Sequence, residues 1–470
     1  MNEENVNTQK EQRRKLGIHL TSSDIFEEYI YSEISEILYD YLWVDLYCGE
    51  GNLIFPILDK INERDRSDFF GKHIFLSDIQ PKMVQRCKDR ARAYGIEESY
   101  INKNVVTADN LNRFPSKLKR MRYPIFHITN PPYLYLGYIR KHKETKSHLK
   151  YFTDNNDGYQ DLYQIAMIND LRQGIKNLIY IIPTNFIFGA SVSNKFRKDF
   201  LRYYNIKKII IFESKIFRHT GTNILIGFFE RKSEPSESPL EFSGIKLKTN
   251  KKFIRSYHLV PEFNYRAGTP FYTFIQKHRI KTPLKVSYYL KKSYVQQNNG
   301  SHKLAVIDSN KYRSGKYQKR TITINKSLFK KIKSNILYVK TVDSGSYDGR
   351  AGLYKIKTDF DVDGILVSGN TYRTSPIHLF LEPSIPLNDQ ELLMNYFNFI
   401  LEYFRKKLDS EFLTTYKYSN AKYTRKYLGL RQVRKIIKTF PILELTDNNK
   451  LILEKAISNK SFSQVRKILK

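Results

Sequence analysis

The tetrapeptide Asn130-Pro131-Pro132-Tyr133 combines an amide side chain, a rigid backbone and a flat aromatic ring in four consecutive positions. Proline fixes its own φ and keeps the preceding residue out of the helical region, so this segment is stiff. The Asn130 amide oxygen and the Pro131 carbonyl can each accept a hydrogen bond from a planar amino group, while the Tyr133 ring stacks on the heterocycle that carries it. Consecutive prolines also occur in rigid loops, so the neighbouring residues must decide between the two interpretations.

Three acidic residues precede this tetrapeptide, and each stands at the carboxyl end of a short apolar run: Asp45, Asp78 and Asp109. A single acidic residue in such a place most often caps a helix. Three of them before a run that ends at Asn130 form a rarer pattern, because doubly wound folds bind cofactors where the carboxyl ends of parallel strands meet. There Asp78 can accept hydrogen bonds from both hydroxyls of a ribose, and Asp109 can accept one from an adenine amino group.

Two glycines, Gly49 and Gly51, lie in the loop after the first of these runs, next to Tyr47. Glycines at this spacing allow the backbone to approach a ligand closely. The nicotinamide dinucleotide fingerprint requires a third glycine at the position that Ile54 occupies, so a dinucleotide is disfavoured. No segment matches the phosphate-binding loop of nucleotide triphosphatases.

From about residue 40 short apolar runs alternate with amphipathic stretches, which predicts an α/β fold with a mostly parallel sheet. The predicted strands are 42–46, 73–77, 104–107, 125–129, 178–182, 208–212 and 224–230. The predicted helices include 24–41, 82–94, 162–173 and 193–203. Too few residues separate the last two strands for a crossover helix, so they are expected to form an antiparallel hairpin at the edge of the sheet.

The segment 231–239 is rich in Ser, Glu and Pro, the composition of a linker. It places the expected boundary between a catalytic domain, residues 1–235, and a mixed α+β domain, residues 240–470. In the second domain the sequence predicts two short strands and a helix, at 303–307, 364–368 and 389–407.

The formal net charge of +33 is concentrated in the second half of the 470-residue chain. Residues 1–235 hold 36 Lys and Arg against 29 Asp and Glu, a net +7, whereas residues 236–470 hold 44 against 18, a net +26. A field of this sign favours a polyanionic partner such as nucleic acid. The runs 311–320 and 416–438 interleave cations with tyrosines, which predicts contacts with phosphates.

The sequence disfavours membrane and metal partners. No apolar run approaches roughly 18 residues, the length needed to span a bilayer, and the polar N-terminus does not resemble a signal peptide. The two cysteines, Cys48 and Cys87, provide neither a disulfide framework nor zinc-ligand spacing. We therefore expect a protein of the bacterial or archaeal cytoplasm that binds no metal and no membrane.

On these residues the chain resembles the γ-type, TaqI-like adenine-N6 DNA methyltransferases, which have a Rossmann-like fold and use S-adenosylmethionine. The resemblance covers roughly residues 15–230 and includes segments 17–26, 160–163, 181–185 and 213–217. It implies that a catalytic pocket is formed by Asn130, Pro131, Pro132, Tyr133 and Phe217, with Phe217 and Tyr133 stacking on opposite faces of an extruded base. It assigns cofactor binding to Thr21, Asp45, Tyr47, Gly49, Gly51, Asp78, Ile79, Asp109 and Asn110.

The resemblance implies site-specific methylation of adenine N6 in duplex DNA after base flipping, by a basic target-recognition domain joined to the catalytic one. We further expect a monomer that modifies DNA in a restriction system, and the sequence leaves open whether a cognate endonuclease acts on the same site. Asn130, rather than a serine, before the prolines favours adenine-N6 over cytosine-N4. A cytosine-C5 enzyme would need a nucleophilic cysteine beside a proline, and neither cysteine has that setting.

Three alternatives remain open at this level. An RNA adenine methyltransferase shares the pocket chemistry and also needs a basic surface. A protein glutamine methyltransferase shares the tetrapeptide but leaves the +26 half without a role. A DNA-binding module with an inactive methyltransferase fold would not need the intact tetrapeptide.

Overall fold

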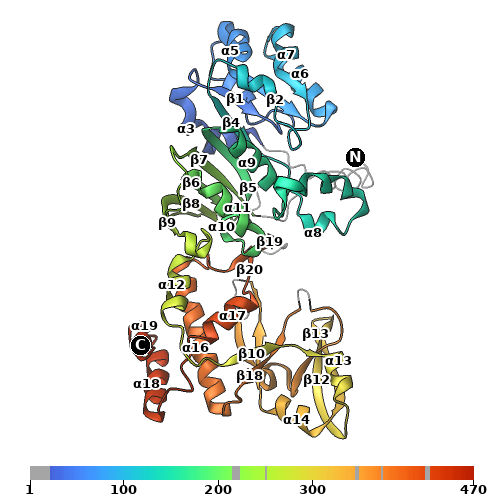
Figure 1. The fold of residues 1–470 in the computed structure, drawn as a ribbon, viewed down its shortest axis with the longest axis vertical. Coiled ribbons are helices and arrows are strands. Elements are labelled where there is room, and N and C mark those ends of the chain that lie inside the picture. The colour runs from blue at the N-terminus through green and yellow to red at the C-terminus, as the bar shows by residue number, and fades with distance from the viewer. Residues whose placement is uncertain are drawn as a thin grey trace. The chain divides into compact units, whose positions relative to one another are not determined.

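The computed structural model describes residues 22–213, 223–248, 251–344, 349–371, 374–418 and 424–469. The chain divides into two compact units (Figure 1). The first runs to Ala267 and also takes in the short segment Lys417–Ala421, and the second comprises the rest of the chain from Gly268. We call them unit 1 and unit 2.

Unit 1 is built on a nine-stranded sheet with the strand order β3-β2-β1-β4-β5-β7-β6-β8-β9. Its strands are β1 (Leu42–Asp45), β2 (Ile74–Asp78), β3 (Val105–Thr107), β4 (Ile125–Thr129), β5 (Asn177–Pro183), β6 (Tyr204–Phe212), β7 (Ile224–Arg231), β8 (Leu240–Lys248) and β9 (Lys251–Leu259). Strands β3, β2, β1, β4 and β5 are mutually parallel. Strand β7 is antiparallel to both β5 and β6.

The helices of unit 1 follow its strands along the chain. They are α2 (Ser23–Tyr29), α3 (Tyr31–Ile34), α4 (Phe55–Leu58), α5 (Arg66–His73), α6 (Pro81–Ala93), α7 (Glu98–Asn104), α8 (Leu136–Ile139), α9 (Leu162–Gln173), α10 (Asn185–Phe188) and α11 (Ser191–Leu201). Its 3-10 helices are η1 (Ser35–Ile37), η2 (Glu63–Asp65), η3 (Ser116–Arg120), η4 (Lys143–Phe152), η5 (Asp154–Asn156) and η6 (Pro261–Phe263).

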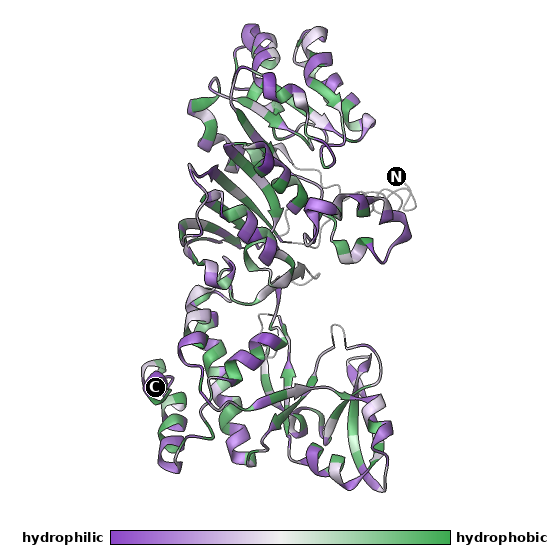
Figure 2. Cartoon of the chain, viewed as in Figure 1, coloured by the Kyte–Doolittle hydropathy of each residue, from purple (hydrophilic) through white to green (hydrophobic). Residues whose placement is uncertain are grey.

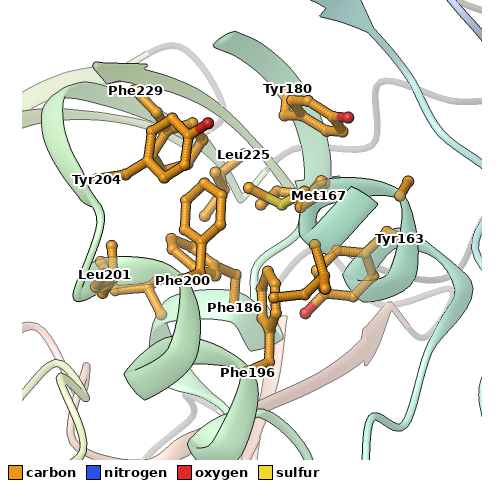
Figure 3. Close-up of a cluster of buried hydrophobic side chains, with 14 of the residues drawn as sticks. Tyr163, Met167, Tyr180, Phe186, Phe196, Phe200, Leu201, Tyr204, Leu225 and Phe229 are labelled. Carbon is orange, nitrogen blue, oxygen red and sulfur yellow. The ribbon is translucent and has the colours of Figure 1, made fainter. Parts of the chain in front are cut away.

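Helices pack on both faces of this sheet, and its central strands are mostly coloured as hydrophobic residues (Figure 2). In β5, Leu178 and Tyr180 belong to a cluster formed with α9, α10 and α11, whereas Ile179 and Ile181 belong to a cluster formed with α2 and α4 to α7. Aromatic rings dominate the first cluster (Figure 3), where Phe200 stacks on Tyr204 with 4.5 Å between centroids. Burial on both faces explains why these strands appear in the sequence as continuous apolar runs.

The structure confirms the α/β fold and the seven strands predicted in unit 1, and its helix α9 has the predicted bounds. The predicted helix over 24–41 is instead divided into α2, α3 and η1. The predicted antiparallel pairing of the last two strands is also confirmed, between β6 and β7.

The domain boundary lies later than the sequence predicts. In the predicted linker 231–239, Arg231 ends β7 and residues 232–239 form a surface loop that joins β7 to β8. Unit 1 continues to Ala267 because β8 pairs in parallel with β6 and β9 pairs with β8. The β6–β7 pair therefore lies inside the sheet rather than at its edge. Strand β8 alternates buried and exposed residues, the pattern of a strand with one solvated face, so it lacks the continuous apolar run that marks the central strands.

Unit 2 has the mixed α+β architecture that the sequence predicts, with sheets of order β10-β18-β14-β16, β11-β17-β12-β13 and β15-β20-β19. Its strands are β10 (Lys285–Tyr288), β11 (Leu290–Lys291), β12 (His302–Arg313), β13 (Lys316–Ile324), β14 (Leu337–Lys340), β15 (Val342–Asp343), β16 (Gly352–Lys355), β17 (Gly364–Val367), β18 (Ile377–Glu382), β19 (Thr414–Tyr418) and β20 (Thr424–Tyr427). Its helices are α12 (Thr269–Lys277), α13 (Lys292–Gln297), α14 (Lys326–Lys333), α15 (Ile356–Phe360), α16 (Leu387–Leu408), α17 (Leu430–Ile437), α18 (Asp447–Ser458) and α19 (Phe462–Ile468). Across the described ranges, none of the helices has the length and apolar character required to cross a bilayer.

The later boundary predicts how fragments of the chain behave. A fragment of residues 1–267 should unfold in one cooperative transition, because it keeps the complete sheet. A fragment of residues 1–235 loses β8 and β9, which exposes the edge of β6 with its apolar side chains Ile209 and Ile211 and favours aggregation. Urea denaturation and size-exclusion chromatography of the two fragments check this, and equal behaviour of the two would contradict the boundary at Ala267.

Candidate active site

The carboxyl ends of β2, β1 and β4 are adjacent in the sheet and present Asp78, Asp45 and Asn130, respectively. Strand β2 lies on one side of β1 and β4 on the other, so the strand order reverses between β1 and β4. In doubly wound folds ligands bind at this topological switch point. The residues singled out in the sequence are thus brought to one edge of unit 1.

The loop after β1 is shaped by its two glycines. Gly49 and Gly51 have φ values of 54° and 76°, the left-handed region that other residues adopt at a cost. A Cβ on Gly51 would lie 2.4 Å from the Phe55 ring. The Asp78 carboxylate accepts a hydrogen bond from the Gly49 amide at 2.9 Å and another from the Gln80 amide at 2.9 Å. The loop is therefore attached directly to the end of β2, and burial raises the pKa of Asp78.

Helix α6 supports the same loop through contacts that the sequence did not indicate. The Arg90 guanidinium donates to the Asn52 side chain at 2.5 Å and to the Glu50 carbonyl at 3.3 Å. Arg86 forms an ion pair with the Glu50 carboxylate. The Cys87 thiol lies 3.2 Å from the Gly49 carbonyl oxygen. These partners lie 36 to 40 residues away in the chain, and local sequence patterns do not reveal contacts at such separations.

Asp45 connects the end of β1 to the end of β4. Its carboxylate accepts a hydrogen bond from the Thr129 hydroxyl at 2.6 Å and one from the Tyr47 amide at 3.0 Å. Burial raises the pKa of Asp45 to about 6, although the hydrogen bond from Thr129 opposes this shift. Since Thr129 immediately precedes Asn130, Asp45 links the glycine loop to the tetrapeptide.

A buried polar network, which no local sequence pattern indicates, lies beneath this edge. His127 Nε2 accepts a hydrogen bond from the Leu46 amide at 3.2 Å, so the imidazole proton is on Nδ1, which donates to Asp170 at 2.6 Å. The Tyr180 hydroxyl donates to the same carboxylate at 2.5 Å. The network thus satisfies the Leu46 amide just beyond β1 and orients the imidazole from β4.

The Asn130–Tyr133 tetrapeptide is folded on itself at the end of β4. The Tyr133 hydroxyl donates to the Asn130 amide oxygen, and the Ile181 carbonyl at the end of β5 is a second acceptor. Burial raises the pKa of Tyr133 well above its usual range, so the hydroxyl keeps its proton. Pro131 is buried and Pro132 is half-buried, and the Asn130 oxygen faces a hydrogen-bond donor already within the protein.

Two further segments noted in the sequence contact this tetrapeptide or its neighbours. The Asp161 carboxylate, at the start of α9, accepts a hydrogen bond from the Leu134 amide at 2.9 Å. The Tyr163 hydroxyl donates to the Asn185 side chain at 2.7 Å, and its ring makes an edge contact with Tyr133 at 6.4 Å between centroids. Burial raises the pKa of Asp161 to about 7.

Beyond β3, Asp109 and Asn110 have different surroundings. Asp109 accepts hydrogen bonds from the Tyr151 hydroxyl at 2.8 Å and from Lys150 at 3.0 Å, both in η4. The Asn110 side chain is buried and donates to the Leu46 carbonyl at 2.6 Å, while its amide oxygen has no hydrogen-bond partner among the described residues. Ile79, after Asp78, is 52% exposed, so an apolar surface lies open beside this carboxylate.

Two predicted site residues, Thr21 and Phe217, lie outside the described residues. In the described ranges, no group of three or more His, Cys, Asp or Glu side chains has the geometry of a metal site. The remaining predicted positions are all at, or directly after, the carboxyl ends of β1 to β4.

Comparison with known families gives one match. Residues 72–217 match the family described as Eco57I restriction-modification methylase. This range, less than half of the chain, contains Asp78, Asp109 and the Asn130–Tyr133 tetrapeptide. A comparison with curated protein sequences found no match.

Among solved structures, the type IIL restriction-modification enzyme MmeI, solved in complex with DNA, is 11% identical, with a TM-score of 0.54 over 97% of this chain and 75% of that chain. This likeness shows a shared fold across both units. The DrdV chain of a DNA complex (14% identical, TM-score 0.39) and a modification subunit of a putative type I restriction enzyme from Vibrio vulnificus YJ016 (13% identical, TM-score 0.36) match 54% and 59% of this chain. The chain spans only 31% and 57% of those two proteins.

The raised pKa of Asp161 predicts a pH-dependent effect on stability. The unfolded carboxyl titrates near 3.8 and the folded one near 7, so the folded state holds the proton more tightly and this group lowers stability as the pH rises through that window. Asn at this position keeps an acceptor for the Leu134 amide and does not titrate. From pH 5 to pH 8, Asp161→Asn should gain roughly 2–3 kcal/mol of unfolding free energy relative to the wild type.

Urea denaturation at both pH values measures this difference. Asp157→Asn, at an exposed position in the same loop, is the matched control and should show no such change. An Asp161→Asn effect that is independent of pH would contradict the assignment.

Proposed function

We propose that this protein is a site-specific DNA methyltransferase that transfers a methyl group from S-adenosylmethionine to the N6 amino group of adenine, as the modification enzyme of a restriction system. The observation that carries the proposal is the switch-point edge of unit 1. There the Gly49–Gly51 loop and Asp78 lie on one side, and the Asn130–Tyr133 tetrapeptide lies on the other, joined by Asp45. This proximity supports the proposal of a methyl-donor site beside an acceptor site.

The first side of the edge fits S-adenosylmethionine. The Asp78 carboxylate has lone pairs beyond the two that its backbone partners use, so it can accept from ribose hydroxyls. The exposed Ile79 side chain offers an apolar face for the adenine ring. The Asn110 amide oxygen, buried without a partner among the described residues, supplies a further acceptor. The cofactor would supply an electrophilic methyl group on a sulfonium.

Asp109, in this proposal, contacts the adenine amino group of the cofactor. Its carboxylate already accepts hydrogen bonds from Tyr151 and Lys150, so the ligand must share or displace these partners. Thr21, by its resemblance to the motif that precedes the glycine loop, would lie beside the methionine moiety.

The second side of the edge fits the target base. The amino nitrogen of adenine is a weak nucleophile because its lone pair is delocalised into the ring. Hydrogen bonds accepted by the Asn130 amide oxygen and the Pro131 carbonyl would favour a pyramidal nitrogen with its lone pair directed at the methyl donor. The Tyr133 hydroxyl holds the Asn130 oxygen beforehand, and the target amino group takes over as the donor.

A base within a duplex cannot reach this pocket, so it must be flipped out at a cost of a few kcal/mol. Stacking worth about 1–3 kcal/mol per base offsets this cost. Tyr133 provides one stacking face in our proposal, and Phe217 provides the other by its resemblance to the γ-type motif. The assignment to the γ-type subclass rests on the same order of motifs.

Unit 2 is the proposed target-recognition domain, with the catalytic domain extended to Ala267. Most of the chain's positive charge lies in its second half, and phosphate contacts supply much of the affinity of DNA-binding proteins. Long-read sequencing of DNA from cells that express the protein tests the function, because it reports the modified base and the sequence motif together. Methyl transfer to RNA but not to duplex DNA in parallel assays would overturn the DNA assignment.

Asn130→Ala should remove methyl transfer without removing binding. Loss of one preorganised hydrogen-bond partner of the reacting nitrogen should lower turnover by at least about 100-fold. Affinity for S-adenosylmethionine and for duplex DNA should stay within about twofold of the wild type, since neither depends on a single amide. Tritiated methyl transfer, calorimetry and fluorescence anisotropy measure the three quantities.

Asn155→Ala, an exposed position in the same unit, is the control for Asn130→Ala. If the Asn130 variant turned over at a rate near that of this control, the proposed role of Asn130 in methyl transfer would be wrong.

Asp78→Asn should specifically weaken binding of the cofactor. Replacing a carboxylate that accepts from ribose hydroxyls by an amide should lower affinity for S-adenosylmethionine by about tenfold or more. Asp89→Asn, on the exposed face of α6, provides the comparison in the same calorimetric titration. If the two variants bound S-adenosylmethionine with equal affinity, the assignment of Asp78 to the cofactor site would be wrong.

A further inference from the structure

A polar groove lies at one edge of the sheet β11-β17-β12-β13 in unit 2. Strands β11, β17 and β12 are parallel, with Leu290 and Asp308 both paired with Leu366. The carboxyl ends of β11 and β17 therefore lie together, beside the point where β12 leaves its pairing with β17. The segments that leave these ends, residues 291–296 and 367–371, line a groove of about 480 Å³.

The chemistry of this groove is cationic and polar. The side chains that line it come from Lys291, Lys292, Ser293, Gln296, Val367, Ser368, Asn370 and Thr371, with Gly369 between them. There is no carboxylate in this set, and Val367 is its one apolar side chain. Pockets for small organic ligands are lined mainly by apolar and aromatic side chains, so the lining favours a polar, anionic occupant.

The cations of the groove are available to such an occupant. Lys291 and Lys292 are exposed, and neither forms an ion pair with a carboxylate of the described residues. Nearby cations of the same sheet differ, since Lys319 pairs with Asp361 and Arg320 with Asp308. Gln296 is exposed as well, and its side chain forms no hydrogen bond within the described ranges.

A bulge in β12 connects the groove to the end of the β12–β13 ribbon. The pairing skips from Asp308 to Tyr312, which leaves residues 309–311 outside the ladder. In this bulge, the Asn310 side chain accepts a hydrogen bond from the Gly369 amide at 2.8 Å and donates to the Asn370 carbonyl at 3.0 Å. The ribbon is therefore attached to the wall of the groove.

The end of this ribbon continues the positive surface. Lys311, Arg313 and Lys316 are exposed and form no ion pair with the described carboxylates. Between them the Tyr312 ring is 57% exposed. The Tyr317 hydroxyl donates to the Ser375 carbonyl at 3.0 Å, which fixes the ribbon to the body of unit 2. A two-stranded β-ribbon of this kind fits the major groove of DNA.

We propose that this groove, together with the end of the β12–β13 ribbon (Figure 1), is the surface by which unit 2 holds duplex DNA. Lys291 and Lys292 contact phosphates, and Gln296 reads a base edge. An amide side chain pairs with adenine in the major groove through two hydrogen bonds, which gives Gln296 a role in sequence choice that the lysines lack. The inference rests on the proposed DNA methyltransferase function and names the residues that carry its specificity.

The test compares two double variants of the full chain. Lys291→Ala/Lys292→Ala removes two charges from the groove. Lys326→Ala/Lys330→Ala removes two exposed charges from α14, which begins after the opposite end of the ribbon, where Ile324 pairs with His302. The probe is a 30-base-pair duplex that carries the motif found methylated in cells, and fluorescence anisotropy measures its affinity over a series of salt concentrations.

The groove variant should bind the duplex at least about tenfold more weakly, and its salt slope should fall by about 1.8, or 0.9 for each lost phosphate contact. The α14 variant should stay within about twofold of the wild type. Equal affinities and slopes of the two variants would overturn the proposal. Tighter binding of an RNA hairpin than of the duplex, lost in the groove variant, would equally overturn it in favour of RNA.

Gln296→Ala separates base reading from phosphate contact. It should relax or shift the set of methylated sequences in expressing cells while leaving affinity for S-adenosylmethionine unchanged, and Gln297→Ala, its exposed neighbour, is the control. An unchanged motif would overturn the role of Gln296. A wild-type chain that neither binds nor methylates duplex DNA would instead overturn the proposed function itself, so the two failures are distinguishable.

Discussion

The hydrogen bonds that join the ends of β1 and β4 are the constraint on which the site depends. Thr129 donates to Asp45 across the two strands, and His127 of β4 accepts from the Leu46 amide. Strands β1 and β4 are paired as far as Val44 and His127, and the backbone groups of the loops beyond that pair need other hydrogen-bond partners. Side chains satisfy these groups in this protein, so the glycine loop and the tetrapeptide hold fixed positions relative to each other.

Buried carboxylates are used for the same purpose throughout the edge. Asp45, Asp78 and Asp161 each accept hydrogen bonds from backbone amides of the loops that they hold. Burial raises the pKa of all three carboxyl groups and so disfavours their ionised form. The same burial lets each carboxylate hold its loop in one position. Desolvated carboxylates of this kind concentrate at functional sites, which agrees with the place of Asp45 and Asp78 at the switch point.

Parallel strands with two buried faces are the part of the fold that sequence patterns report well. The apolar runs that end at Leu46, Ser77 and Thr129 predicted β1, β2 and β4 within one or two residues. The domain boundary was missed for the complementary reason: β8 alternates buried and exposed residues and β9 is mostly exposed, so neither strand has the continuous apolar run of a central strand. The two strands belong to unit 1 because β8 pairs with β6 and β9 pairs with β8. The β6–β8 pairing joins segments that are distant in the sequence, so no local pattern reveals it.

The sequence by itself determined the order of chemical groups: three acidic strand ends, a glycine loop and the Asn130–Tyr133 tetrapeptide, because strand ends and proline stiffness are local properties. Only the tertiary structure decided what each group contacts. It placed Tyr151 and Lys150 on Asp109, Asp161 on the Leu134 amide, and Lys291 beside residues 367–371 in one groove. These partners are chosen by packing between segments far apart in the chain, and no local periodicity records that choice.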